Sequence, residues 1–293
     1  MNLVFQQAAL GDFALILPLL RGLEGPKTFV GPWSRGRLAA ALVEDCSHVD
    51  IEMFEFTRFH TEEGPHTLSP MVAELFERAL VIVSFVSDGE DDWAANVVKW
   101  APQCNLLCLP VRPPGDGFVH VVDYHREQLL SHGIALAEVP TAVTGDPAGP
   151  VVIHPGSGGR EKCWPLDRFE ALVRAYRKHH RPVRVIYGEA EAERWPQEEL
   201  ERWHAEYDAV GCGSLECLVE QLLNASAYIG NDAGPTHLAA QLGLPTTALF
   251  GPSDPTLWSP RGAQVNVVVP DSPTGMDWLS VNDLLGRLGL DGE

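Results

Sequence analysis

The chain has 293 residues, of which 45% are hydrophobic and 21% are charged, a composition typical of globular proteins and a length sufficient for two domains of ordinary size. It carries 21 Lys and Arg residues against 40 Asp and Glu residues, a formal net charge of -19. This charge opposes binding to polyanions through the overall electrostatic field. We therefore predict that nucleic acid is not a partner.

The chain is expected to be a cytoplasmic protein. Its first long apolar run, residues 13–20, follows Asp12 and has neither a basic cluster before it nor a small-residue cleavage site after it, so no signal peptide is predicted. No stretch approaches the roughly 18 apolar residues that cross a bilayer. The six cysteines include no C-x-x-C pair, which favours reduced thiols over a disulfide framework.

In the first half of the chain, short apolar runs alternate with longer helical patterns, which predicts a parallel sheet covered by helices. The expected strands are 3–7, 28–30, 49–54, 80–85 and 105–109. The expected helices are 13–23, 33–43, 68–78, 91–100 and 119–132.

Residues 140–150, PTAVTGDPAGP, concentrate turn-forming residues without hydrophobic periodicity and are the best candidate linker. The alternation then restarts, so we predict an α/β protein with two domains, 1–145 and 146–293, each built on a parallel sheet, and a cleft between them. The expected strands are 151–154, 183–187, 207–210, 228–230, 246–250 and 265–269, and the expected helices are 165–180, 190–205, 214–224, 235–242 and 278–288.

The first candidate site is the motif ALGD, residues 9–12, directly after the first predicted strand. Gly11 permits a tight turn, and Asp12 falls at the carboxyl end of the strand, where α/β folds bind ligands. The alternative, which the local sequence by itself favours, is that Asp12 caps a helix that begins at Phe13. A G-x-G-x-x-G fingerprint is absent here, which argues against a dinucleotide-dependent dehydrogenase.

The second candidate is HPGSGGREKCWP, residues 154–165, after the first strand of the second half. Its glycines, Gly158 among them, leave backbone N–H groups accessible, Ser157 adds a hydroxyl, and Lys162 adds a positive charge. Together these groups suit a phosphate. The spacing is not that of a Walker A loop, and a mobile glycine loop with a solvated lysine is the alternative.

The third candidate is GNDAGPTH, residues 230–237, between an apolar strand and a helix. A proline in the first helical turn loses no hydrogen bond, and the free N–H groups and the helix dipole then favour an anion such as a diphosphate. Asp232 is expected to accept hydrogen bonds from sugar hydroxyls or to orient the loop. The alternative is an ordinary strand–helix corner. The residues expected at the anion are Gly234, Pro235, Thr236 and His237.

Three glutamates follow the strand at 183–187, and one of them, Glu191, is a candidate to reach a ribose. A solvated helix face is the alternative reading for this segment. No His, Cys, Asp or Glu cluster has metal-ligand spacing, so neither a metal nor a cofactor is predicted.

Taken in order, the three loops resemble glycosyltransferase family 9, the heptosyltransferase-like family of lipopolysaccharide core assembly. The resemblance runs nearly the whole chain. It is carried by FQQAALGDFALILPLLRGL near the start, by HPGSGGREKCWPLDRF in the middle, and by YIGNDAGPTHLAAQLGLPTTALFGPSDP near the end, which is similar to a D-x-G-x-x-H signature followed by A-A-x-x-G-x-P.

The resemblance implies a GT-B fold of two Rossmann-like domains whose parallel sheets face a central cleft, with the acceptor bound mainly by the first domain and a nucleotide-sugar donor by the second. It also implies inverting, metal-independent transfer of a sugar, heptose from ADP-heptose, to a lipopolysaccharide core or another cell-surface glycan or glycolipid. Through that acceptor, peripheral contact with the cytoplasmic face of the inner membrane is expected.

The resemblance also implies roles for single residues. Asp12 would be the general base, and Lys162 with the helix start at 234–237 would stabilise the departing diphosphate. Ser157 would hold the same phosphates, Asp232 would contact the donor sugar, and Glu191 would contact the ribose. This division fits a single displacement, which needs one base on the acceptor side and charge stabilisation on the leaving-group side.

Several positions depart from the family pattern. Ala233 stands where many relatives carry a hydroxyl residue, and Gln6 and Gln7 stand where some carry a basic residue. Two alternatives stay open at this point: a GT-B nucleotide-sugar epimerase, which would need no acceptor, and a non-catalytic member that binds a nucleotide or a glycan.

Overall fold

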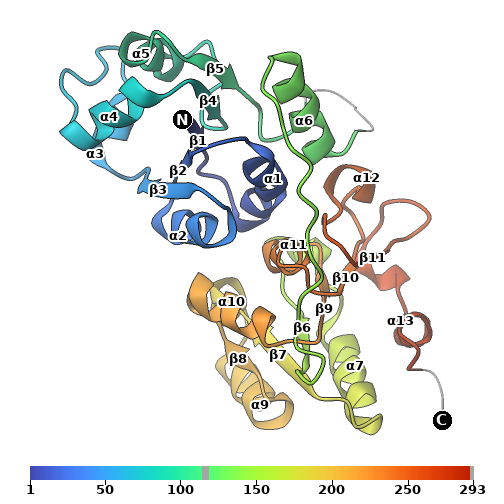
Figure 1. Cartoon of the computed structure of the whole chain (residues 1–293). Helices are drawn as coiled ribbons and strands as arrows, with labels where there is room; N and C mark the ends of the chain where they lie inside the picture. Colours follow the sequence, from blue (N-terminus) through green and yellow to red (C-terminus); the bar gives the residue numbers. More distant parts are fainter. Residues whose placement is uncertain (114–118, 291–293) are drawn as a thin grey trace. The chain divides into compact units, whose positions relative to one another are not determined.

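The computed structural model describes residues 1–113 and 119–290 and divides into two compact units, Met1–Val139 and Pro140–Glu293. Figure 1 draws the first unit from blue to green and the second from green to red. Each unit is an α/β layer structure around a parallel sheet, which confirms the predicted fold class.

The first unit holds a five-stranded sheet in the order β3-β2-β1-β4-β5, and every neighbouring pair is parallel. Its strands are β1 (Asn2–Phe5), β2 (Lys27–Gly31), β3 (Cys46–Asp50), β4 (Val81–Ser84) and β5 (Asn105–Cys108). Its helices are α1 (Leu10–Gly22), α2 (Trp33–Leu42), α3 (Phe54–Arg58), α4 (Pro70–Arg78), α5 (Asp92–Trp100) and α6 (Val121–Ser131).

Aromatic side chains fill the core of the first unit. Phe5 on β1 meets Phe56 and Trp93 edge to face at ring-centroid distances of 5.8 and 5.1 Å, a favoured geometry for aromatic pairs. Phe13 on α1 meets Phe29 on β2 in the same way at 5.4 Å. Phe29 pairs with Val4 in the sheet, and successive residues of a strand face opposite sides, so Phe5 and Phe29 lie on opposite faces. Helices therefore pack on both faces of the sheet.

The second unit holds a six-stranded parallel sheet in the order β11-β10-β9-β6-β7-β8. Its strands are β6 (Val151–His154), β7 (Val183–Tyr187), β8 (Val210–Gly211), β9 (Ala227–Asn231), β10 (Thr246–Leu249) and β11 (Val265–Val268). Its helices are α7 (Leu166–Lys178), α8 (Glu189–Arg194), α9 (Gln197–Tyr207), α10 (Leu215–Leu223), α11 (Gly234–Gln241), α12 (Pro255–Trp258) and α13 (Val281–Arg287), with 3-10 turns η1 (Arg160–Lys162) and η2 (Met276–Trp278).

The expected linker, residues 140–150, belongs to the second unit. The Thr144 N–H donates to the Gly243 carbonyl at 2.9 Å, and the Asp146 N–H donates to the Ala225 carbonyl at 2.9 Å. These backbone hydrogen bonds hold the segment on the second sheet's own helices and turns. The unit boundary therefore falls at 139/140 instead of after residue 145.

Three expected elements differ in the structure. The strand expected at 49–54 ends at Asp50, because β3 pairs with β2 only from Cys46 to Asp50 and the short helix α3 begins at Phe54. The helix expected at 190–205 is two helices, since Pro196 cannot continue a helix. Tyr207, expected to begin a strand, is the last residue of α9, which buries Leu200, Trp203 and Tyr207 on one face.

Among the helices of residues 1–113 and 119–290, none combines the length and the apolar character needed to cross a membrane. All six cysteines lie in the described part of the chain and are free thiols.

Candidate functional site

The strand order of the second sheet brings three polar loops together. Strand β6 lies between β9 and β7, and all three run parallel. Their carboxyl ends therefore share one edge of the sheet, where α/β folds bind ligands. The glycine loop after His154, the corner after Asn231 and helix α8 after Tyr187 meet there, although 70 residues separate Lys162 from Asp232.

Asp232 is the centre of this edge. Its Oδ2 atom accepts a hydrogen bond from Nζ of Lys162 at 2.7 Å, and its Oδ1 atom lies 3.3 Å from Nε2 of His237. Because a carboxylate only accepts, Nε2 of His237 carries a proton. His237 and Asp232 are buried, whereas the Lys162 side chain is 34% exposed. The lysine charge is thus held by a buried acid at the surface of the unit.

Burial raises the pKa of Asp232, but hydrogen bonds from His237, Lys162 and Ser253, together with the Lys162 charge, outweigh it and lower the pKa to about 2. Asp232 is therefore a carboxylate at neutral pH. His237, which was expected at the anion, is one of the groups that hold this carboxylate.

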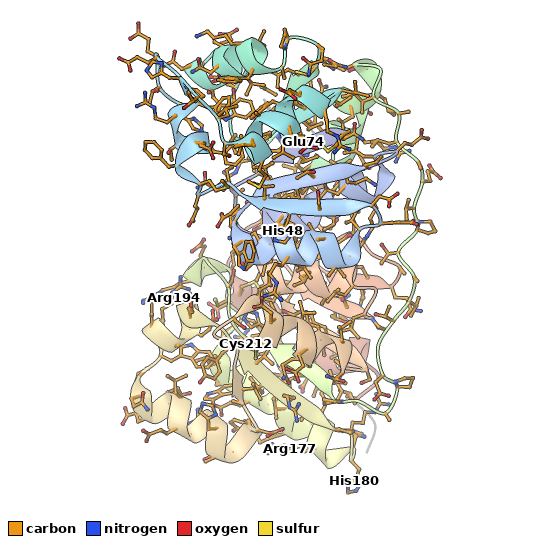
Figure 2. The ribbon with its side chains drawn as sticks, turned by 60° about the vertical axis from the view of Figure 1, so that its left-hand side comes forward. His48, Glu74, Arg177, His180, Arg194 and Cys212 are labelled. Carbon is orange, nitrogen blue, oxygen red and sulfur yellow. The ribbon has the colours of Figure 1, made fainter. Side chains whose placement is uncertain are left out.

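The glycine loop is held by two residues that the sequence analysis missed. The buried Asn231 donates through Nδ2 to the carbonyls of Pro155 and Gly156 at 2.9 and 3.2 Å and accepts from the Trp164 N–H at 3.0 Å. Arg194, labelled in Figure 2, donates to the carbonyls of Ser157 and Gly158, both at 2.7 Å. Asn231 directly precedes Asp232 at a strand end, a signal that was available, but nothing local marks Arg194.

Two hydroxyl groups expected near a phosphate are engaged by the protein. The Oγ atom of Ser157 donates to the Asp232 carbonyl at 2.9 Å. It would have to rotate away to donate to a phosphate. Thr236 is fully buried and its hydroxyl donates to the Asn231 carbonyl, so this side chain serves the strand–helix corner.

The start of α11 corrects one expectation. Pro235 lies in its first turn as predicted, but the N–H groups of Thr236 and His237 both donate to the Ala233 carbonyl, at 3.0 and 3.3 Å. Ala233 is the extended N-cap residue and directs its carbonyl into the first turn. These two amides are therefore not free for an anion, which leaves the first amide of the helix, that of Gly234.

Glu191 is buried, contrary to the alternative of a solvated helix face. Its Oε2 atom accepts from the Gly188 N–H at 3.0 Å and lies 3.5 Å from Nε2 of His154. Burial raises its pKa, but the hydrogen bond and charge of His154 and the Gly188 amide outweigh burial, and the net pKa is lowered. Glu191 thus stays ionised beneath the glycine loop.

A cavity of about 260 Å³ lies beside Glu191, between the glycine loop and helix α8. Its walls combine an aromatic ring, a carboxylate and guanidinium groups, the mixture that small-molecule sites use. The lining residues include Gly156, Arg160, Trp164, Glu191, Arg194 and Trp195.

In the first unit, Asp12 lies in the first turn of α1, at the carboxyl end of β1, and is half-buried. It does not cap a helix that begins at Phe13, because α1 begins at Leu10 and the Phe13 N–H donates to the carbonyl of Ala9, the N-cap. Burial lowers the pKa of Arg35 and of His125, and the negative charge of Asp12 opposes this lowering in both. Asp12 thus lies at the carboxyl edge of the first sheet, where α/β folds bind ligands.

Next to Asp12 lies a buried glutamine. Gln6 is 1% exposed, and neither polar atom of its side chain has a hydrogen-bond partner among the described residues. A buried polar group without a hydrogen-bond partner lowers the free energy of unfolding by roughly 1–3 kcal/mol.

No group of three or more His, Cys, Asp or Glu residues within 1–113 and 119–290 is arranged to hold a metal ion.

Two parallel sheets with polar carboxyl-end loops define a two-unit α/β protein of the GT-B class. The chain belongs to glycosyltransferase family 9 (heptosyltransferase), which residues 118–277, more than half of the chain, match.

Known relatives agree with this family. The chain is 28% identical over 138 residues to lipopolysaccharide heptosyltransferase 1 of Campylobacter coli, and 28% identical over 116 residues to lipopolysaccharide heptosyltransferase 3 of Escherichia coli K12. These stretches cover 45% and 38% of this chain but 38% and 33% of the relatives. The match thus spans less than half the length of these proteins.

Solved structures share the fold over nearly the whole chain. The family 9 glycosyl transferase of Veillonella parvula matches with a TM-score of 0.71 at 16% identity and covers 99% of this chain and 96% of its own. The E. coli heptosyltransferase WaaC with ADP matches with a TM-score of 0.67 at 18% identity and covers 99% of both chains.

Proposed function

We propose that the protein is an inverting, metal-independent glycosyltransferase that moves heptose from ADP-heptose to a hydroxyl group of a lipopolysaccharide core or another cell-surface glycan. The observation that carries this proposal is the group of Lys162, Asp232 and His237 beside the glycine loop. It places a lysine charge where α/β folds bind nucleotides. The names of the relatives, heptosyltransferases of lipopolysaccharide, support the choice of sugar and acceptor.

The donor would lie along the carboxyl edge of β9, β6 and β7. The nucleoside would occupy the cavity beside Glu191, whose carboxylate accepts from ribose hydroxyls, and the diphosphate would face Lys162 and the glycine loop. The two carboxylate oxygens of Asp232 have four lone pairs together, and three of them are used by Lys162, His237 and Ser253. The remaining lone pair is suited to a hydroxyl group of the sugar.

Asp12 would act as the general base. Its carboxylate takes the proton of the acceptor hydroxyl while that oxygen forms a bond to the anomeric carbon. The bond from the anomeric carbon to the diphosphate breaks on the opposite face, which inverts the configuration, and its electron pair leaves with the nucleoside diphosphate. Lys162 stabilises the negative charge that develops there. A membrane-anchored acceptor would bring the protein to the cytoplasmic face of the inner membrane by peripheral contact.

The test compares two acids in equivalent local positions. Asp12 and Asp92 each lie in the first turn of a helix of the first unit, and Asp92 is exposed. We expect Asp12→Asn to lower kcat by roughly 10²- to 10⁴-fold, the usual share of a general base, with the ADP dissociation constant unchanged. Asp92→Asn should keep wild-type turnover.

The assay measures ADP release from ADP-heptose with a heptose-deficient lipopolysaccharide core, with and without a metal chelator, and the anomeric configuration of the product by NMR. Full turnover by Asp12→Asn would rule out Asp12 as the general base. Conversion of ADP-heptose without acceptor would indicate an epimerase, and ADP binding without any turnover would indicate a binding protein. Loss of rate in the chelator would contradict metal independence.

A further inference from the structure

The environment of Gln6 calls for an explanation. This residue directly follows β1, and its N–H donates to the Val30 carbonyl at 3.0 Å, so the strand pairing continues through its backbone and fixes where its side chain starts. Both polar atoms of the side chain are nevertheless buried without a partner among the described residues. Native proteins rarely leave such groups unpaired unless a water molecule or a ligand completes them. An apolar side chain at this position would avoid the desolvation cost of the buried amide.

A small cavity of about 10 Å³ adjoins Gln6, the lower limit of the space that one water molecule occupies. Asp12 and His125 line it with Gln6, and the remaining walls are apolar. Nε2 of His125 lies 2.8 Å from the Pro110 carbonyl. Because a carbonyl only accepts, Nε2 carries the proton and Nδ1 is an acceptor in the neutral ring. Burial favours that neutral ring by lowering the pKa of His125.

We propose that Gln6 is a positioning residue that holds one water molecule against Asp12 and thereby orients the carboxylate. The three side chains offer the two to four polar partners that a buried water requires. Either amide atom of Gln6 can serve, since water both donates and accepts. One hydrogen of the water points to Asp12, which favours the ionised carboxylate and limits its rotation. The role of Asp12 as base belongs to the proposed function, on which this inference rests.

Gln6→Met tests the inference, because methionine keeps the length of the side chain and removes its hydrogen bonds. The exposed neighbour Gln7 supplies the matched control, Gln7→Met. A high-resolution crystal structure of the wild type should show a water roughly 2.7–3.2 Å from both Gln6 and Asp12, and the Gln6→Met structure should lack it. The kcat for transfer from ADP-heptose to a heptose-deficient lipopolysaccharide core should fall about 5- to 10-fold, the effect of one neutral hydrogen bond.

The KM for ADP-heptose should not change in Gln6→Met. The Tm should not fall, since the single water pairs one amide atom of Gln6 and methionine removes the other, which stays unpaired. Gln7→Met should match the wild type in every measurement. A cavity without water in the wild type would overturn the inference, and so would a Gln6→Met variant with wild-type kcat. If Asp12→Asn loses turnover while Gln6→Met keeps it, only the role of Gln6 fails. If Asp12→Asn keeps turnover, the proposed function fails at the base.

Discussion

The Nζ atom of Lys162 lies 2.7 Å from Oδ2 of Asp232, although one residue follows β6 and the other follows β9. The Lys162 side chain remains 34% exposed, whereas that of Asp232 is 7% exposed. The buried acid therefore holds the lysine ammonium at the surface, where the diphosphate of the proposed donor would meet it. Removing the Lys162 charge should weaken ligand binding, whereas removing the Asp232 carboxylate should lower the stability of the fold.

Lys162→Met should weaken ADP binding. A charged hydrogen bond contributes about 1.5–3 kcal/mol, so we expect the ADP dissociation constant to rise roughly 10- to 100-fold, as measured by titration calorimetry. Lys178→Met is the control, because Lys178 is exposed in the last turn of α7 of the same unit. Equal dissociation constants for the two variants would show that Lys162 does not meet the diphosphate.

The Asp232 carboxylate should make stability depend on acid pH. Its folded-state pKa of about 2 lies below the roughly 3.9 of an unfolded aspartate, so the stabilisation is complete above about pH 5 and is lost as the pH falls toward 2. Urea unfolding should show Asp232→Asn less stable than the wild type by a constant margin from pH 7 to about 5, and a shrinking margin below about 4.

Asp277→Asn is the matched control for that measurement. It also removes a negative charge from the second unit, but the Asp277 side chain is 91% exposed, and its difference from the wild type should stay within about 0.5 kcal/mol. A margin for Asp232→Asn that stays constant down to the most acidic pH would contradict the pKa assignment.

Gly156→Ala should disturb Glu191. A Cβ atom at position 156 would lie 2.0 Å from Oε1 and 2.1 Å from Cδ of Glu191, and the buried glutamate is held by Gly188 and His154. We expect a loss of about 1–3 kcal/mol in the free energy of unfolding, as for other overpacked sites, and weaker ADP binding. Gly213→Ala meets nothing within 4 Å, so its stability and ADP binding should match the wild type. A Gly156→Ala variant as stable as Gly213→Ala would contradict this geometry.

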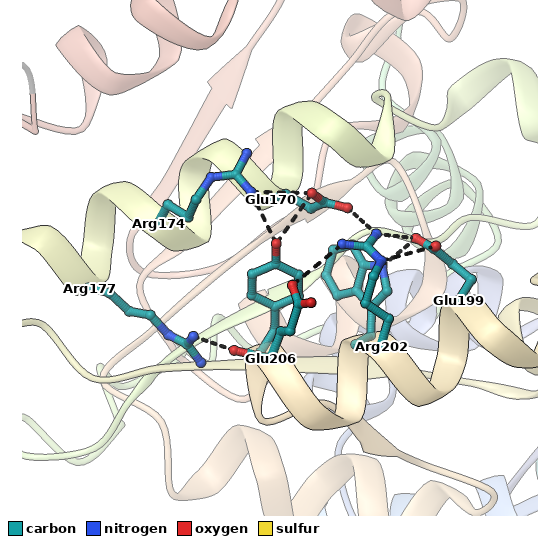
Figure 3. A network of polar contacts seen from close by, with 8 residues as sticks. Glu170, Arg174, Arg177, Glu199, Arg202 and Glu206 are labelled. Atoms are coloured by element: carbon teal, nitrogen blue, oxygen red, sulfur yellow. Dashed lines mark hydrogen bonds and ion pairs between the residues drawn. The ribbon is translucent and has the colours of Figure 1, made fainter.

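Glu170 joins α7 to α9 in the polar network of Figure 3. It accepts hydrogen bonds from Arg202, from Arg174 at 3.3 Å and from the Tyr207 hydroxyl at 3.3 Å. These hydrogen bonds, that of Arg202 foremost, lower the pKa of Glu170 despite its burial. The Arg202 side chain is 34% exposed, so water screens part of this attraction.

Glu170→Gln should therefore lower the free energy of unfolding by about 1–2 kcal/mol, between a surface ion pair and a fully buried one. Glu193→Gln, at an exposed position of α8, should change it by less than about 0.5 kcal/mol. Urea denaturation of both variants measures the difference. Equal midpoints would show that the network adds nothing to stability.

Local sequence determined much of the fold. Strands 151–154 and 183–187 were predicted with the bounds that the structure has, because each is a short, mostly apolar run flanked on both sides by Pro or Gly. Once the strands were located, the residues that directly follow them were predicted at the carboxyl edges of the sheets. Where helical and strand periodicity overlap, as at Tyr207, burial of this residue in the core of the second unit and its hydrogen bond to Glu170 on α7 decided for the helix.

The partners of each site residue depended on the tertiary structure. The sequence placed Lys162, Ser157 and Asp232 after strands, but only the order β9-β6-β7 brought their loops to one edge. Only that arrangement shows that Ser157 donates to the Asp232 carbonyl and that His237 holds the carboxylate. Periodicity and turn propensity act over a few residues, so a sequence reveals elements and their ends. Hydrogen bonds between residues 70 or more positions apart form only when the strand order is complete.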